Sequence, residues 1–131
     1  MAGGYEKNRE RKEALSALGR GLARRSGSQC ELCGTSGVPL TAYEVSPVPE
    51  TPDPDRCIFI CQVCLSGLDN IKKSNPNHWR CLSGPLWSDI SALKVTAVRV
   101  LKKLEADHHW AANLLEEIYL EPEEEEWVEM P

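Results

Sequence analysis

Two Cys-x-x-Cys pairs, separated by 27 residues, constrain this sequence more than any other feature. The first pair is Cys30 and Cys33, followed by Gly34, and the second is Cys61 and Cys64. Each pair can hold a metal ion with two thiolates from one tight turn, and Gly34 provides the backbone freedom that such a turn requires. This spacing predicts one tetrahedral Zn²⁺. Because four protein ligands leave no open coordination position for a substrate, we expect the zinc to be structural.

Disulfide bonds are the alternative use of the six cysteines. They are typical of exported proteins, but the first residues of this sequence lack the apolar run of a secretory signal. An apolar span of about 18 residues, as a membrane helix requires, is also missing. We therefore expect a metal site, no membrane association and a cytoplasmic location. With one Phe and three Tyr in 131 residues the core must be lean, and such a small domain benefits from a structural metal.

Basic residues gather at the N-terminal end, although the net charge of the chain is −5. Residues 1–26 contain seven basic and three acidic residues. Leucines recur there at helical spacing (Leu15, Leu18 and Leu22), so we expect a basic N-terminal helix over about residues 5–25. Its apolar stripe is narrow, which favours a helix that is mobile or that packs on a partner.

The two ends of the chain carry opposite charge. After Lys103 the sequence contains ten acidic residues and no Lys or Arg, and we interpret residues 121–131 as an acidic tail. The apolar pair Trp127 and Val128 within this tail predicts a partner contact. A basic N-terminal end favours nucleic-acid binding, although an acidic tail opposes charge-driven DNA binding by the whole molecule. The candidate nucleic-acid contacts are Arg20, Arg24 and Arg25.

The segment between the two cysteine pairs predicts a β-hairpin. Residues 38–45 carry apolar side chains in loose alternation, and residues 58–60 form a short apolar run, so each is expected to be a strand. Residues 46–56 contain four prolines, which exclude both a helix and a central strand. We expect a stiff, exposed loop between the two strands.

The second cysteine pair should lie at the start of a short helix, predicted for residues 65–71. A cysteine knuckle, a β-hairpin and a helix whose first turn carries the second ligand pair follow one another in the order of a treble-clef zinc fold. We therefore predict a small α+β protein in which residues 27–87 form a Cys₄ zinc module of the treble-clef or zinc-ribbon kind.

The last third of the chain predicts two helices. Apolar residues at helical spacing indicate one helix over residues 91–106 and another over residues 110–120, ended by Pro122. The connection is short, so we expect a helical hairpin over residues 88–120 that packs on the zinc module.

The segment from Leu40 to Pro47 resembles the catalytic motif of HNH endonucleases, which also carry two Cys-x-x-Cys pairs. Here Tyr43 stands where that family has a metal ligand, and Glu44 stands where it has the general-base histidine. A nuclease of this type needs a neutral imidazole and a hard cation. The resemblance therefore implies the fold without the usual active site. A degenerate hydrolase of phosphate or phosphonate esters, using Glu44 with help from His78, is an alternative function.

A longer set of residues resembles the PhnA-type zinc-ribbon proteins, a family encoded with bacterial alkylphosphonate-use genes. The matching strings are Cys30-Glu-Leu-Cys33-Gly34, Tyr43-Glu-Val-Ser-Pro47, Cys61-x-x-Cys64, Asn77-His-Trp-Arg-Cys-Leu82 and Trp110-Ala-Ala-Asn-Leu-Leu115. They belong to a match over about residues 25–127. The resemblance implies a zinc ribbon and a link to phosphonate metabolism, but it names no reaction.

The remaining cysteines and aromatic residues have no obvious chemical role. Free cysteines are usually buried, so we place Cys57 and Cys81 in the core. The alternatives are a redox pair, or an exchange of Cys57 with the ligands. We expect His78 to bond to backbone, while Trp79 and Trp87 cover the zinc module.

The sequence thus predicts a non-enzymatic zinc-binding adaptor or regulatory protein with an unknown protein partner. The predicted ligand set is closed, and no group suited to catalysis converges with it. Nucleic-acid binding and degenerate hydrolysis are the two alternative functions.

Overall fold

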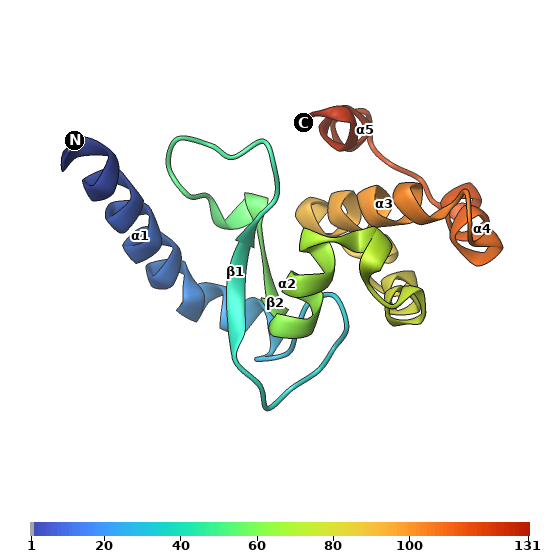
Figure 1. Ribbon diagram of the computed structural model, residues 1–131, viewed down its shortest axis with the longest axis horizontal. Helices are drawn as coiled ribbons and strands as arrows, with labels where there is room; N and C mark the ends of the chain where they lie inside the picture. Colours follow the sequence, from blue (N-terminus) through green and yellow to red (C-terminus); the bar gives the residue numbers. More distant parts are fainter. Residues whose placement is uncertain (1) are drawn as a thin grey trace.

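The computed structural model describes residues 2–131, with side chains from residue 7 onward. The fold is α+β, as the sequence predicts, and joins a two-stranded hairpin to helices on both sides (Figure 1). The strands are β1 (Leu40–Glu44) and β2 (Cys57–Cys61). The α-helices are α1 (Ala2–Ser26), α2 (Gln62–Asp69), α3 (Ser91–Leu104), α4 (His109–Glu117) and α5 (Pro122–Glu129). Short 3₁₀ turns lie at Pro54–Arg56, Ile71–Lys73, Pro76–Ser83 and Pro85–Trp87.

The hairpin is antiparallel and confirms the predicted strand pair. Leu40 lies opposite Cys61, and Glu44 lies opposite Cys57. β1 begins at Leu40 rather than at residue 38, because Pro39 has no N–H to donate to a ladder. The register places the second cysteine pair at one end of the hairpin and Glu44 at the other.

α3 forms the centre of the hydrophobic core. It packs against α4, α5 and the 3₁₀ turn at Pro85–Trp87. A helix that is apolar on most of its surface must be covered on most sides. This holds for α3, whose buried residues are Ala92, Leu93, Val95, Thr96, Ala97, Val98, Val100, Leu101 and Leu104. Among the described helices, none is both long enough and apolar enough to cross a membrane.

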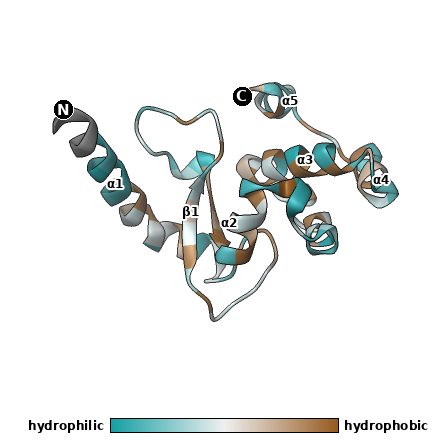
Figure 2. Ribbon diagram, in the orientation of Figure 1, coloured by the Kyte–Doolittle hydropathy of each residue, from teal (hydrophilic) through white to brown (hydrophobic). Residues whose placement is uncertain are grey.

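α1 packs on the hairpin of its own chain rather than on a partner. Leu22 is buried, and α1 contacts both β1 and β2. The Arg11 guanidinium donates to the Glu44 carboxylate (Nε to Oε2, 2.9 Å) and to the carbonyl oxygen of Pro49 (2.7 Å). The N-terminal end of α1 nevertheless projects away from the other elements, and Figure 2 colours its described outer turns as hydrophilic.

Residues 121–131 form a docked helix where the sequence predicted an acidic tail. Pro122 occupies the first turn of α5 instead of ending the preceding helix, since a proline ring suits the first turn of a helix. Glu124 is only 6% exposed and accepts hydrogen bonds from Ser91 Oγ (2.7 Å) and Lys94 Nζ (3.0 Å), both on α3. Its carboxylate also accepts from the Glu121 N–H, which closes a capping box.

Trp127 and Val128 contact their own chain, so the predicted partner contact is wrong for this pair. Trp127 Nε1 donates to the carbonyl oxygen of Ser46 (2.9 Å), and the Arg56 guanidinium stacks 4.9 Å from the Trp127 ring. Val128 is buried against the core. α5 thus packs against the proline-rich loop of residues 46–56.

Candidate metal centre

The four cysteine sulfur atoms form one cluster, hereafter the cysteine cluster (Cys30, Cys33, Cys61 and Cys64). All four Sγ atoms lie within 4.8 Å of one another. The Cys30–Cys64 and Cys33–Cys61 Sγ distances are both 3.7 Å. A tetrahedron with metal–sulfur bonds of about 2.3 Å has edges of about 3.8 Å. The observed spacing therefore fits a metal ion held by four thiolates.

The first pair lies in a tight knuckle. The Cys33 N–H points at Cys30 Sγ (3.5 Å), and the Gly34 N–H donates to the Cys30 carbonyl oxygen (2.8 Å). Gly34 has φ +82°, a left-handed conformation that side chains with a Cβ rarely adopt. The chain can therefore reverse immediately after the second sulfur, as the sequence predicted.

The second pair lies where β2 becomes α2. Cys61 is the last residue of β2 and the N-cap of α2, and Cys64 lies in the first turn of that helix. The N-terminal end of a helix carries partial positive charge, which favours thiolates. The predicted helix start is confirmed in kind, although α2 begins three residues earlier than predicted.

Glu31, between the first two ligands, ties the knuckle to β2. Its N–H donates to the Phe59 carbonyl oxygen, and its carboxylate accepts from the Phe59 N–H, each at 2.8 Å. Arg25 then donates to both Glu31 carboxylate oxygens (2.9 and 2.6 Å) and to the Cys57 carbonyl oxygen (2.9 Å). These bonds fix the position of the first cysteine pair relative to β2, which carries Cys61.

This ion pair changes the interpretation of Arg25. The sequence offered Arg25 as a nucleic-acid contact, but its guanidinium is half-buried and makes four hydrogen bonds within the protein, two of them to Glu31. The other two candidates, Arg20 and Arg24, are exposed on α1. The sequence could not separate Arg24 from Arg25, since the difference depends on which face of α1 meets Glu31.

Burial and mutual repulsion shape the acidity of the cluster. Cys30, Cys61 and Cys64 are buried, and Cys33 is half-buried. The hydrogen bond between the two sulfurs lowers the pKa of Cys30 to about 4, while that same bond, together with burial, raises the pKa of Cys64. A divalent cation bound by all four sulfurs would neutralise their thiolates.

His78 lies at the edge of the cluster. Its Nε2 atom is 3.2 Å from Cys64 Sγ, so the expectation that its side chain bonds to backbone is wrong. The Asn75 carbonyl oxygen accepts from the His78 N–H (3.0 Å), and the Trp79 ring meets the imidazole edge-on at 4.9 Å. The sequence gives little sign of this contact, because a 3₁₀ turn brings His78 back to α2.

Trp79 supports the cluster from beneath α2. It is fully buried, and its Nε1 donates to Ser74 Oγ (2.8 Å). A Cβ on Gly67 would lie 2.6 Å from Cζ2 of Trp79, so this α2 position must be glycine for the indole to approach. Trp87, which was also predicted to cover the module, is instead 62% exposed.

The two remaining cysteines are not suited to redox chemistry. Burial raises the pKa of Cys57, and burial together with the nearby Cys33 and Cys30 thiolates raises the pKa of Cys81 to about 12. A reactive thiol needs the opposite shift. Cys57 is buried as predicted, whereas Cys81 is half-buried. Cys57 starts β2 and Cys61 ends it, about 13 Å apart at the rise of a strand, so an exchange of ligands is ruled out.

Glu44 does not meet the groups that a hydrolytic site would require. Its carboxylate is paired with Arg11, and it lies at the end of the hairpin away from Cys61. His78 is at the cluster end. Among the side chains of residues 7–131, the cysteine cluster is the one group of histidine, cysteine or acidic residues spaced to hold a metal.

Comparison of the chain with protein families, with curated proteins and with solved structures found no match. Any functional conclusion therefore depends on the geometry and charge of the residues described above.

Proposed function

We propose that this protein is a non-enzymatic zinc-binding adaptor or regulatory protein built on a Cys₄ module of the treble-clef or zinc-ribbon kind. The observation that carries the proposal is the closed, mostly buried set of four sulfurs, all within 4.8 Å of one another. Soft thiolate ligands in tetrahedral arrangement are the preferred set for Zn²⁺ and exclude Mg²⁺ and Ca²⁺.

The bound zinc would neutralise the thiolates and supply folding energy to the small hairpin. The protein residues do the rest. The knuckle and the β2–α2 junction orient the sulfurs, Glu31 with Arg25 keeps the two pairs in register, and His78 covers Cys64. No ligand position remains for a substrate, so the module holds surfaces in place and performs no chemistry at the metal.

We further propose that the protein is related to the PhnA-type zinc-ribbon family and has a role connected with phosphonate metabolism. Support comes from the residues that carry the resemblance. Several of them lie at or beside the cysteine cluster, including His78 at Cys64 and Trp79 beneath α2. A shared local arrangement would explain why these residues recur together.

Metal content and cysteine substitution test the zinc proposal. Native mass spectrometry should find one zinc per chain, and Cys61→Ser should lose the metal and much of the folded structure seen by circular dichroism. Cys57→Ser is the matched control, because Cys57 is equally buried on the same strand but lies outside the cluster. It should keep the zinc. Zinc-free protein with unchanged circular dichroism would refute the proposal.

Nucleic-acid binding is a second candidate, favoured by the surface of α1. Lys12, Arg20 and Arg24 are exposed and fall within about 120° of the helix circumference at ~100° per residue. The N-terminal end of this helix stands clear of the body (Figure 1). A cationic helix face of this kind can lie along a phosphate backbone.

Salt dependence and two double variants test this candidate. Binding to single-stranded DNA or RNA should weaken steeply with salt, and Arg20→Gln with Arg24→Gln should abolish most of it. Lys72→Gln with Lys73→Gln is the control, since these two exposed lysines lie away from α1. Binding that ignores salt, or that responds equally to both pairs, would exclude α1 as the interface.

A further inference from the structure

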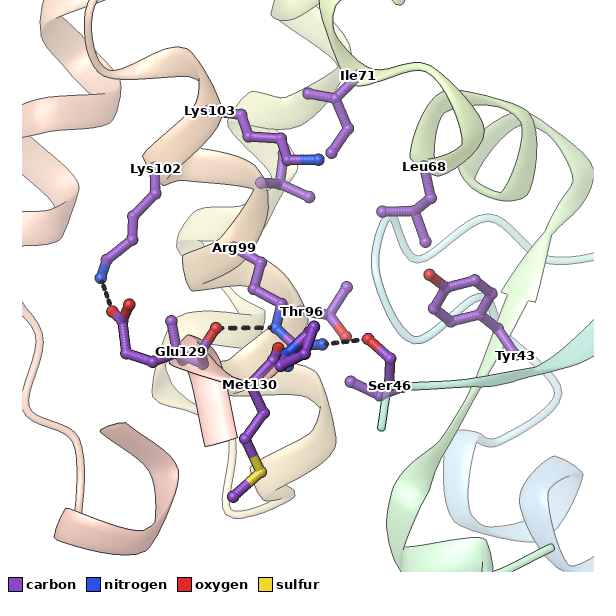
Figure 3. A pocket seen from close by; sticks show the side chains of 14 residues that line it. Tyr43, Ser46, Leu68, Ile71, Thr96, Arg99, Lys102, Lys103, Glu129 and Met130 are labelled. Atoms are coloured by element: carbon purple, nitrogen blue, oxygen red, sulfur yellow. Dashed lines mark hydrogen bonds and ion pairs between the residues drawn. The ribbon is translucent and has the colours of Figure 1, made fainter. Parts of the chain in front are cut away.

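A cavity of about 450 Å³ lies where the hairpin, α2, α3 and the end of α5 meet (Figure 3). Its volume is within the range of small-molecule sites, about 300–1,000 Å³. It is separate from the cysteine cluster, since none of the four cysteines lines it. The apolar part of its lining is formed by Val45, Leu68, Ile71, Val100 and Val128.

The charged part of the lining is mainly positive. Three cationic residues of α3 line the cavity, and Glu129 is the one acidic side chain among the lining residues. Glu129 is already paired with Lys102 (2.7 Å). Among the ion pairs of the described chain, neither Arg99 nor Lys103 has a carboxylate partner. Two cationic side chains of the lining are therefore left without an acidic side-chain partner, the exposed Lys103 and the half-buried Arg99.

Arg99 is the more unusual of these two cations. Its guanidinium is half-buried and donates to neutral acceptors alone: Ser46 Oγ (3.0 Å) and the carbonyl oxygens of Trp127 (2.6 Å), Val128 (3.2 Å) and Met130 (2.9 Å). The carbonyls at the end of α5 supply only about half a negative charge. A guanidinium has five N–H groups, so one on Nη1 is left over. Because these acceptors are neutral, the guanidinium keeps its attraction for an anion in the cavity.

Two other polar groups face the same space. Figure 3 shows the Lys103 ammonium beside Ile71 and the Tyr43 hydroxyl near Leu68, and all four residues line the cavity. The Tyr43 side chain is half-buried, and its hydroxyl has no hydrogen-bond partner among the described residues. An ammonium and a phenol hydroxyl that line one cavity together with apolar side chains suit an anion with an apolar body.

We propose that this cavity binds a small organic carboxylate, with its head group between Lys103, Tyr43 and Arg99 and its apolar body against Leu68 and Ile71. The site shares no residue with the zinc ligands. If the protein is the adaptor proposed above, the site lets a small molecule act on it. Because Arg99 also holds the end of α5, a carboxylate bound there fixes α5 more firmly to the hairpin.

Benzoate and its neutral analogue benzamide provide matched probes of this site. In an NMR titration of the full, zinc-loaded chain labelled with ¹⁵N, benzoate should cause saturable shifts at Ser46, Leu68 and Thr96, which line the cavity. Binding should fall in the millimolar range for a ligand of this size. Benzamide should bind about tenfold more weakly, because hydrogen bonds to charged groups are the stronger ones.

Two variants and a control distinguish this cavity from non-specific attraction. Lys103→Gln and Tyr43→Phe should each weaken benzoate binding several-fold, whereas Arg20→Gln should leave it unchanged because Arg20 is exposed on α1 and does not line the cavity. Arg99 is left intact, since it anchors α5. The proposal is overturned if benzoate shifts do not saturate, if benzamide binds equally well, or if neither cavity variant weakens binding.

Discussion

The Nε2 atom of His78 lies 3.2 Å from the Sγ atom of Cys64, the cluster cysteine in the first turn of α2. With the proton on Nε2, the imidazole donates a hydrogen bond to the thiolate of Cys64 in the metal-bound site. Hydrogen bonds from such outer groups orient metal ligands and stabilise their charge. His78 thus acts as an outer group that hydrogen-bonds one of the four ligands.

Replacement of His78 should therefore weaken zinc retention without removing the metal. We expect His78→Ala to lower zinc affinity by about 10–100-fold, the usual effect of losing an outer-shell partner. Competition with a chromogenic chelator measures this change. His109→Ala is the control, because His109 is exposed on α4. Equal zinc affinity in both variants would show that the His78 contact has no effect on the metal.

The close approach of Trp79 to α2 predicts that Gly67 cannot be enlarged. A Cβ at this position would overlap the indole at 2.6 Å, so Gly67→Ala should destabilise the protein by about 1–3 kcal/mol. Gly21→Ala has no atom within 4 Å of the added Cβ and should stabilise α1 by up to about 1 kcal/mol. Urea unfolding of the zinc-loaded proteins compares the two. If Gly67→Ala unfolds like the unchanged protein, the packing of Trp79 described here is incorrect.

The Arg25–Glu31 ion pair should contribute to the free energy of unfolding of the protein. The Glu31 side chain is 4% exposed, so Arg25→Gln leaves a nearly buried carboxylate without its partner. We expect a loss of about 2–3 kcal/mol in the free energy of unfolding. Arg24→Gln, one residue earlier and exposed, should stay within about 0.5 kcal/mol. Denaturant unfolding would contradict this interpretation if the two variants behaved alike.

Docking of α5 should depend on pH through Glu124. Burial alone would raise the pKa of Glu124, but hydrogen bonds from Ser91, the Glu121 N–H and Lys94 outweigh it and lower the pKa below its usual 4.5. A depressed folded-state pKa adds stability that is fully present above the ordinary value. That stability is lost as the pH falls through the lowered pKa.

Hydrogen exchange of the α5 amides measures this docking. Below about pH 4.5 the unchanged protein should show increasing exchange in α5 relative to α3. Glu124→Gln should exchange faster at neutral pH, corresponding to a loss of about 1–3 kcal/mol, and its α5 should lose most of the acid dependence, since only the exposed Lys102–Glu129 pair remains. An α5 that detaches with the same pH profile in both proteins would mean that another group controls docking.

The sequence was a good guide where structure is local. The cysteine spacing predicted the knuckle, and the apolar and proline patterns between the two pairs predicted the hairpin, because each depends on neighbouring residues and on one turn or ladder. The two strands were placed within a few residues, and Pro39 accounts for the late start of β1. The cluster of four sulfurs follows from these elements, since the hairpin register places Cys61 close to the knuckle.

The sequence was a poor guide where distant segments meet. The Trp127 indole donates a hydrogen bond to the carbonyl oxygen of Ser46, 81 residues earlier. No local pattern in an acidic segment predicts such a contact. Arg25 and Arg24 are neighbours with opposite exposure, decided by Glu31 across the knuckle. His78 reaches Cys64 through a 3₁₀ turn whose path follows the burial of Trp79. These contacts are tertiary and override the local signals.

X-ray absorption at the zinc edge tests the central claim most directly, because it reports the ligands of the metal itself. We predict one zinc per chain, surrounded by four sulfur atoms at about 2.3 Å, in the unchanged protein and in His78→Ala alike. A shell of three sulfurs and one nitrogen at about 2.0 Å, lost in His78→Ala, would show that His78 is a ligand and that one cysteine is free. That result, or protein that folds without zinc, would contradict a closed four-cysteine structural site.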